Sequence, residues 1–125
     1  MAKSKCYNSG MGKFVKIAVY VPAKYADKIR DAMHLAGCGQ IGNYDYCSFS
    51  VKGVGRYRGG KMSGPFIGKS GRITKVAEER IETICPKAFL KKALAEIKKV
   101  HPYEEPAIDV YPLLNKFIAQ HGDPK

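Results

Sequence analysis

An imidazole and two carboxylates lie close together in residues 101–107, near the end of the chain. Pro102 disfavours helical backbone at the residue before it, so the apolar helix that precedes this segment should end at His101. Nitrogen and carboxylate groups beside the negative end of a helix dipole suit a divalent cation. Zinc or manganese is favoured over calcium, which prefers oxygen ligands only. The predicted metal ligands are His101, Glu104 and Glu105, and the predicted contacts of a small ligand are Tyr103 and Glu104.

The same segment also has a purely structural interpretation. A basic side chain at a helix C-terminus often caps the last carbonyl groups, and Tyr103 and the two prolines would then pack the turn. Three side chains from one short loop rarely complete a coordination shell, so a metal would also need water or a neighbouring subunit. The residues alone leave both interpretations of His101 open.

The distribution of charge gives a second candidate site. The formal net charge is +11, and residues 51–77 contain no acidic side chain. A basic segment with aromatic residues among its charges attracts the phosphates of nucleic acid. The predicted nucleic-acid contacts are Lys52, Arg56, Arg58, Lys61, Lys69 and Arg72. The segment has no recognisable DNA- or RNA-binding motif, so a solvated basic arm is favoured and nucleic-acid binding is expected to be weak and non-specific.

Other motifs fail in their context. Residues 37–42 fit the Gly-x-Gly-x-x-Gly pattern but follow a helix and precede a strand, the reverse of a dinucleotide-binding site. Residues 64–70 resemble a phosphate loop with one residue too few and no helix after it. The four cysteines form no Cys-x-x-Cys pair, which disfavours a zinc cluster and a redox motif. Because no nucleophile with a matching base is visible, we predict a non-enzymatic protein, with a site completed between subunits as the enzymatic alternative.

Apolar periodicity predicts the elements that position these residues. Alternation predicts a strand at 15–21, and helical spacing predicts a helix at 23–36 that ends at Gly37. Alternation resumes at 44–54. The glycine-rich residues 53–71 are predicted to be a connector and the most mobile internal segment, where trypsin should cut first. The expected cleavage sites are Arg56, Arg58 and Lys61.

The second half repeats this order, with a strand at 74–85, a helix at 87–100 that follows Pro86, and a final strand at 108–113. Leu94 is predicted to lie in the core. The order βαββαβ predicts an α+β ferredoxin-like sandwich, in which two helices cover one face of an antiparallel sheet. The uncovered face is expected to form an interface. Its candidate residues are Tyr20, Tyr44, Tyr46 and Tyr111.

Three blocks resemble a known family in order and spacing: GCGQIGNYDYCSF at 37–49, RIETICP at 80–86 and HPYEEPAIDVYPL at 101–113. From about Phe14 to Leu114 the chain resembles the PII/CutA-like insert domain of the YqfO-type Nif-three-like family, dinuclear-metal proteins also labelled GTP cyclohydrolase I type 2-like. The resemblance implies a PII/CutA-like fold and a homo-oligomer, a trimer by likeness to CutA assemblies or else a dimer. The family's paired metals belong to flanking domains, so it implies no catalytic residue here. The basic residues 56–61 depart from the family's more acidic segment.

The predicted organisation is a flexible N-terminal tail at 1–13, a stand-alone domain at 14–115 and a C-terminal tail at 116–125. No apolar run is as long as a membrane span, and the first twelve residues lack the apolar centre of a signal peptide, so we expect a cytoplasmic protein without a membrane partner. The functional hypothesis is a non-enzymatic, homo-oligomeric regulatory module that binds a small ligand or divalent metal ion. The alternative is a basic accessory protein that binds nucleic acid.

Overall fold

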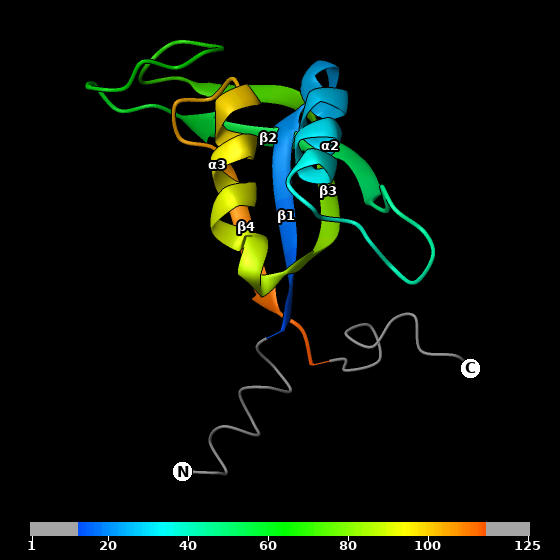
Figure 1. Cartoon of the computed structure of the whole chain (residues 1–125). Coiled ribbons are helices and arrows are strands. Elements are labelled where there is room, and N and C mark those ends of the chain that lie inside the picture. The colour runs from blue at the N-terminus through cyan, green and yellow to red at the C-terminus, as the bar shows by residue number, and fades with distance from the viewer. Residues whose placement is uncertain (1–12, 115–125) are drawn as a thin grey trace.

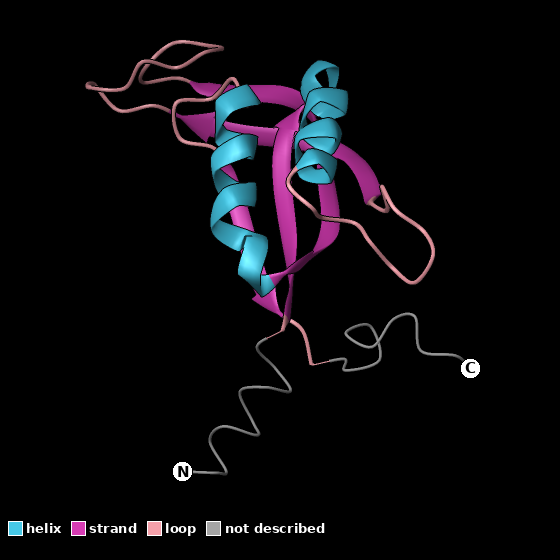
Figure 2. Ribbon diagram, viewed as in Figure 1, coloured by secondary structure: helices cyan, strands magenta, loops and turns pink. Residues whose placement is uncertain are grey.

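The computed structural model describes residues 13–114, so almost all of the two predicted tails lies outside the described residues. The main elements are β1 (Phe14–Pro22), α2 (Ala26–Leu35), β2 (Phe49–Arg58), β3 (Ile73–Pro86), α3 (Leu90–Val100) and β4 (Ala107–Pro112). Short 3-10 helices, η1 (Ala23–Tyr25) and η2 (Lys87–Phe89), lead into the two α-helices. Figures 1 and 2 show both α-helices on one face of the sheet. The predicted α+β ferredoxin-like order βαββαβ is confirmed.

The four strands pair in the order β2-β3-β1-β4, and every neighbouring pair is antiparallel. All of β1 pairs with residues 78–86 of β3, with Val15 opposite Cys85 and Val19 opposite Ile81. Residues directly opposite one another in an antiparallel pair point to the same face. The alternating apolar residues of β1 therefore face the helices together with Ile81 and Cys85, and all of them are buried.

The helices complete this core through short apolar stripes. Ile29 and Met33 of α2 and Ala93 and Ile97 of α3 are buried against the sheet. Leu94 is only partly buried, so its predicted place in the core was wrong. The buried residues of α3 are Ala93 and Ile97, and Leu94 is rotated about 100° from Ala93 and about 60° from Ile97, toward the edge of the contact.

Two boundaries of the hairpin differ from the prediction. The second strand begins at Phe49 rather than at residue 44, and it runs through Gly53 and Gly55 to Arg58. Residues 53–58 are therefore paired strand and not connector. Glycine is tolerated at positions 53 and 55 because β2 lies at the sheet edge. At position 55 glycine is also needed, since a side chain there would clash with the carboxylate of Glu78.

The predicted tyrosines of the open face lie in two places. Tyr20 and Tyr111 are on β1 and β4, on the face away from the helices. Tyr44 instead forms a tight turn with Ile41, closed by two backbone hydrogen bonds of 2.9 Å. The hydroxyl of Tyr46 donates to the carboxylate of Asp31 on α2. Tyr44 and Tyr46 therefore lie in the loop before β2 and not on the open face of the sheet, contrary to the prediction that they form part of its interface.

We call residues 59–72, between β2 and β3, the arm. Its backbone is attached to the rest of the chain at two points. The N–H of Gly64 donates to Glu104 Oε1 at 2.8 Å, and the hydroxyl of Tyr57 donates to the carbonyl of Ile67. The ring of Phe66 contacts the rings of Tyr25 and Tyr103. These contacts tie the arm to β2, η1 and the 101–106 loop, and Figure 1 shows the arm at the upper left, beside that loop.

Among the sites between the two predicted tails, trypsin is expected to cut first within the arm, after Lys61 or Lys69. Arg56 and Arg58 are paired with β3, and a protease needs locally opened backbone, so these two sites should be protected. The measurement is limited digestion followed by intact-mass analysis. The variant with both Lys61→Gln and Lys69→Gln should resist the first cut, and an initial fragment that ends at Arg56 or Arg58 would contradict the assignment.

No helix within residues 13–114 combines the length and the apolar composition that crossing a bilayer requires.

Candidate functional site

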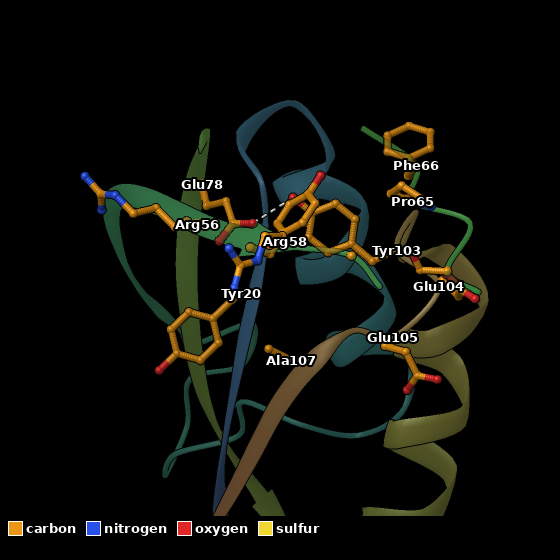
Figure 3. Close-up of a pocket in the computed structure, with 14 residues that line it drawn as sticks. Tyr20, Arg56, Arg58, Pro65, Phe66, Glu78, Tyr103, Glu104, Glu105 and Ala107 are labelled. Carbon is orange, nitrogen blue, oxygen red and sulfur yellow. Dashed lines mark hydrogen bonds between the residues drawn. The ribbon is translucent and has the colours of Figure 1, made fainter. Parts of the chain in front are cut away.

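A cavity of about 540 Å³ lies where β2, the arm and residues 101–106 meet (Figure 3). This volume falls within the range of small-molecule sites, roughly 300–1,000 Å³. Aromatic and charged side chains from segments far apart in the sequence line it. The aromatic residues are Tyr20, Tyr57, Phe66 and Tyr103, and the charged residues are Arg56, Arg58, Glu78, Glu104 and Glu105.

Tyr103 links the aromatic residues of the cavity. Its ring lies 5.7 Å from that of Tyr57 in an edge-to-face arrangement and 6.5 Å from that of Phe66. Aromatic pairs prefer edge-to-face or offset contacts at these separations. The cavity therefore has an apolar wall built from β2, the arm and the loop after α3.

The hydroxyl of Tyr103 is held by a carboxylate from the opposite side of the cavity. It donates to Glu78 Oε2 at 2.7 Å. Burial, together with this hydrogen bond, raises the pKa of Tyr103, so the phenol stays protonated at neutral pH. The absence of a side chain at Gly55 leaves the space that the Glu78 carboxylate occupies. The hydrogen bond between Tyr103 and Glu78 fixes the Tyr103 ring beside Tyr57 of β2.

The ring of His101 lies 5.2 Å from that of Tyr103, and His101 is only 7% exposed. Its backbone N–H donates to the carbonyl of Ile97 at 3.1 Å, and it is the C-cap residue of α3. Its ring Nε2 lies 2.8 Å from the carbonyl of Tyr20, and Nδ1 accepts the backbone N–H of Tyr103 at 3.2 Å. Since a carbonyl only accepts, these partners assign the proton to Nε2. Burial lowers the pKa of His101. The imidazole therefore ties the 101–106 loop to β1.

The predicted metal ligands are not brought together. Both ring nitrogens of His101 are already hydrogen-bonded, and Glu104 accepts the backbone N–H of Gly64. Within residues 13–114, no three His, Cys, Asp or Glu side chains are grouped so that they could hold a metal ion. His101, Glu104 and Glu105 of one chain therefore do not form a metal site by themselves, and a site completed by a neighbouring subunit stays a prediction. Tyr103 and Glu104, the predicted small-ligand contacts, both line the cavity.

The predicted nucleic-acid residues separate into different environments. Arg56 and Arg58 line the cavity, and Lys52 lies opposite Glu79 in the β2–β3 pair. The arm carries the others, which are Lys61, Lys69 and Arg72, all exposed. The two arginines thus belong with the cavity rather than with a continuous basic surface formed by the arm.

Sequence reasoning missed the contributions of Tyr20, Phe66 and Glu78 to this cavity. Glu78 is 25 residues from Tyr103, and no local pattern pairs them. One available signal was Gly55, because a glycine inside a strand often marks the close approach of another group. A second was the strand at 74–85, whose apolar residues change from even positions, such as Val76, to odd positions, such as Ile81, on the two sides of Glu78.

No family model matches the chain. It is 46% identical over 101 residues to a GTP cyclohydrolase 1 type 2 homolog of Halalkalibacterium halodurans, with 81% of this chain and 27% of that protein covered. The Bacillus subtilis protein of the same name is 44% identical over 98 residues, with 78% and 26% covered. The chain thus spans about a quarter of the length of these relatives.

Comparison with solved structures points to the same group of proteins. A Bacillus cereus protein related to NIF3 superposes with a TM-score of 0.69 at 40% identity, covering 82% of this chain and 26% of that one. CutA1 from Shewanella sp. SIB1 superposes with a TM-score of 0.63 at 17% identity, covering 86% and 88%, and shares the fold alone. The chain is therefore homologous to one segment of the Nif-three-like proteins named GTP cyclohydrolase 1 type 2 homologs, and it has the PII/CutA-like fold.

Proposed function

We propose that this chain is a non-enzymatic binding module that holds a small molecule in the cavity between β2, the arm and the 101–106 loop, and that binding serves regulation. The observation that carries this proposal is the convergence of separate segments on one cavity. Tyr20 comes from β1, Arg58 from β2 and Phe66 from the arm, and the loop after α3 supplies Tyr103. A concave site with aromatic walls and a few charged groups is typical of a small-molecule site.

Binding is favoured over catalysis because the phenol and the imidazole that could act as acid or base are held in structural hydrogen bonds. The phenol of Tyr103 is kept protonated and donates to Glu78. Both nitrogens of His101 are hydrogen-bonded to the backbone. The name of the relatives refers to a cyclohydrolase, but the matched segment is about a quarter of their length, and we assign no such chemistry to it.

The arm provides the link from binding to regulation. It meets the 101–106 loop through the Gly64–Glu104 hydrogen bond and the contact between Phe66 and Tyr103. A ligand that packs against both rings would favour the docked arm, because it binds that arrangement better than an undocked one. Occupancy of the cavity would then set how the basic arm is presented to a partner.

Phe66→Ala is expected to abolish small-molecule binding, whereas Phe89→Ala should retain it. The two phenylalanines are matched controls, since they are 50% and 44% exposed and only Phe66 lines the cavity. The measurement is a thermal-shift screen of a metabolite library on the wild type, with hits repeated on both variants by calorimetry. A library without hits, or hits that bind Phe66→Ala as tightly as the wild type, would refute the proposed function.

We also propose a homo-oligomer, with a trimer favoured and a dimer as the alternative. The sheet ends in two edge strands, β2 and β4, and exposed edges need covering. On the face away from the helices Phe49 is 66% exposed, and Tyr111 is also exposed. Exposed aromatic groups on an uncovered sheet face favour an interface.

Light scattering at micromolar concentration is expected to give the mass of a trimer. Phe49→Asp should shift the mass toward the monomer, because a buried unpaired carboxylate is costly at an apolar interface. Phe89→Asp, on the helical side of the molecule, should leave the mass unchanged. A monomer mass for the wild type would exclude the oligomer.

A further inference from the structure

Opposite charges lie on two sides of the cavity. In Figure 3 the side chain of Arg58 lies on one side of the Tyr103 ring, and Glu104 and Glu105 lie on the other. Arg56 also borders the cavity, but its side chain extends away from the other lining residues. The cavity is therefore polarised, with a guanidinium at the β2 end and carboxylates at the end formed by the 101–106 loop.

Some of these charges have no partner in the chain. Within residues 13–114, neither Arg58 nor Glu105 makes an ion pair or a side-chain hydrogen bond. Glu78 lies on the same side as Arg58 and accepts the hydroxyl of Tyr103, whereas Glu104 accepts the N–H of Gly64. Arg58 and Glu105 are thus the two charged groups of the cavity that are available to a ligand at opposite ends.

The charge balance argues against a ligand of one sign. Three carboxylates and two guanidinium groups line the cavity, so a simple anion meets net repulsion, and a simple cation meets Arg58. A ligand that covers a charged side chain must also replace the water around it, which is costly unless the ligand supplies a counter-charge. A molecule with both signs satisfies both ends at once.

Resting on the proposed function, we infer that the ligand is a small dipolar molecule with a flat apolar body. An anionic group, carboxylate or phosphate, would pair with Arg58, since guanidinium matches the planar geometry of both. An amine or amidine at the other end would pair with Glu105. The flat body would lie against the ring of Tyr103, which lies between the two ends, and its neighbours Tyr57 and Phe66.

Four probes built on one benzene ring test this inference. 4-(Aminomethyl)benzoate carries both charges at opposite ends of the ring, 4-methylbenzoate carries only the anion, and 4-methylbenzylamine carries only the cation. 4-(Aminomethyl)benzylphosphonate replaces the carboxylate and so distinguishes the two anionic groups. Binding is measured by calorimetry on the full chain, with amide chemical shifts to locate each probe.

At least one of the two dipolar probes is expected to bind about tenfold or more tightly than either singly charged probe, as a charge-assisted hydrogen bond at each end predicts. Arg58→Gln should remove the advantage over the amine, and Glu105→Gln should remove the advantage over 4-methylbenzoate. Lys52→Gln, on the same strand but outside the cavity lining, should change neither. Unchanged amide shifts of core residues such as Ile97 show that each variant is folded.

The outcomes separate this inference from the proposed function. If 4-methylbenzoate binds as tightly as both dipolar probes, the inference is wrong, whereas a small-molecule site remains. Loss of binding in Arg56→Gln but not in Arg58→Gln would also overturn it. If no probe shifts the cavity residues at millimolar concentration, the inference fails, and the library screen with Phe66→Ala still decides the proposed function independently.

Discussion

Replacing Ile97 by alanine is expected to lower the free energy of unfolding by about 2–5 kcal/mol, the range measured for large-to-small changes in protein cores. Ile97 is fully buried on α3 and belongs to the cluster that joins both helices to β1 and β3. The loss combines the transfer free energy of the deleted carbon atoms with the cost of the cavity they leave. The measurement is urea denaturation, with the slope of the transition compared between proteins.

Two further substitutions make this result specific to the core. Ile97→Val should cost less, about 0.5–1.5 kcal/mol, because it removes only one methylene group. Leu35→Ala, on the other helix, should change the free energy by no more than about 0.5 kcal/mol, as expected for a surface site. Leu35 is 76% exposed. An Ile97→Ala cost as small as that of Leu35→Ala would show that α3 does not pack on the sheet as described.

The sequence predicted correctly those parts of the fold in which buried apolar residues recur at regular spacing. In β1 the residues that face the helices are apolar at every second position, so alternation located the strand. In β2 every residue is partly or fully exposed, and backbone pairing with β3 defines the strand instead. Because periodicity reports burial and not pairing, it placed the start of β2 too early and mistook residues 53–58 for a connector.

The site was harder to predict than the fold because its contacts join distant segments. The 101–107 segment was identified by its residue types, and Tyr103 and Glu104 do line the cavity. The partners of Tyr103 and Glu104 are Glu78 and Gly64, 25 and 40 residues away, and they meet only in the folded chain. Residue types alone also left two roles open for His101, and only its hydrogen-bond partners favour the structural one.

The stability of the protein is expected to fall as the pH is lowered below about 6.5, the ordinary pKa of histidine. Burial lowers the pKa of His101 in the folded protein, although the Tyr20 carbonyl and the charge of Glu78 act in the opposite direction. In the unfolded chain the imidazole takes up its proton at the ordinary pKa. Between the two pKa values the unfolded state therefore binds more protons, and the stabilising contribution of neutral His101 is lost as the pH decreases.

The hydrogen bonds give this linkage a structural cause. Nε2 donates to Tyr20, so a second proton must go to Nδ1, which accepts the backbone N–H of Tyr103. Protonation would leave that N–H without its acceptor and would place a charge in a buried position. Both the unpaired N–H and the buried charge cost free energy in the folded state, and a neutral imidazole avoids both costs.

The experiment compares urea midpoints of the wild type, His101→Gln and His34→Gln between pH 5.5 and 8. The wild type and His34→Gln should lose stability toward acid, with a slope of at most about 1.4 kcal/mol per pH unit for one proton. His101→Gln should be less stable at pH 8 but nearly independent of pH across this window, because glutamine does not titrate. Since His101 holds the loop that carries Tyr103 and Glu105, ligand affinity should decline over the same range. An equally steep loss in His101→Gln would assign the titration to another group and remove His101 as the link between pH and the cavity.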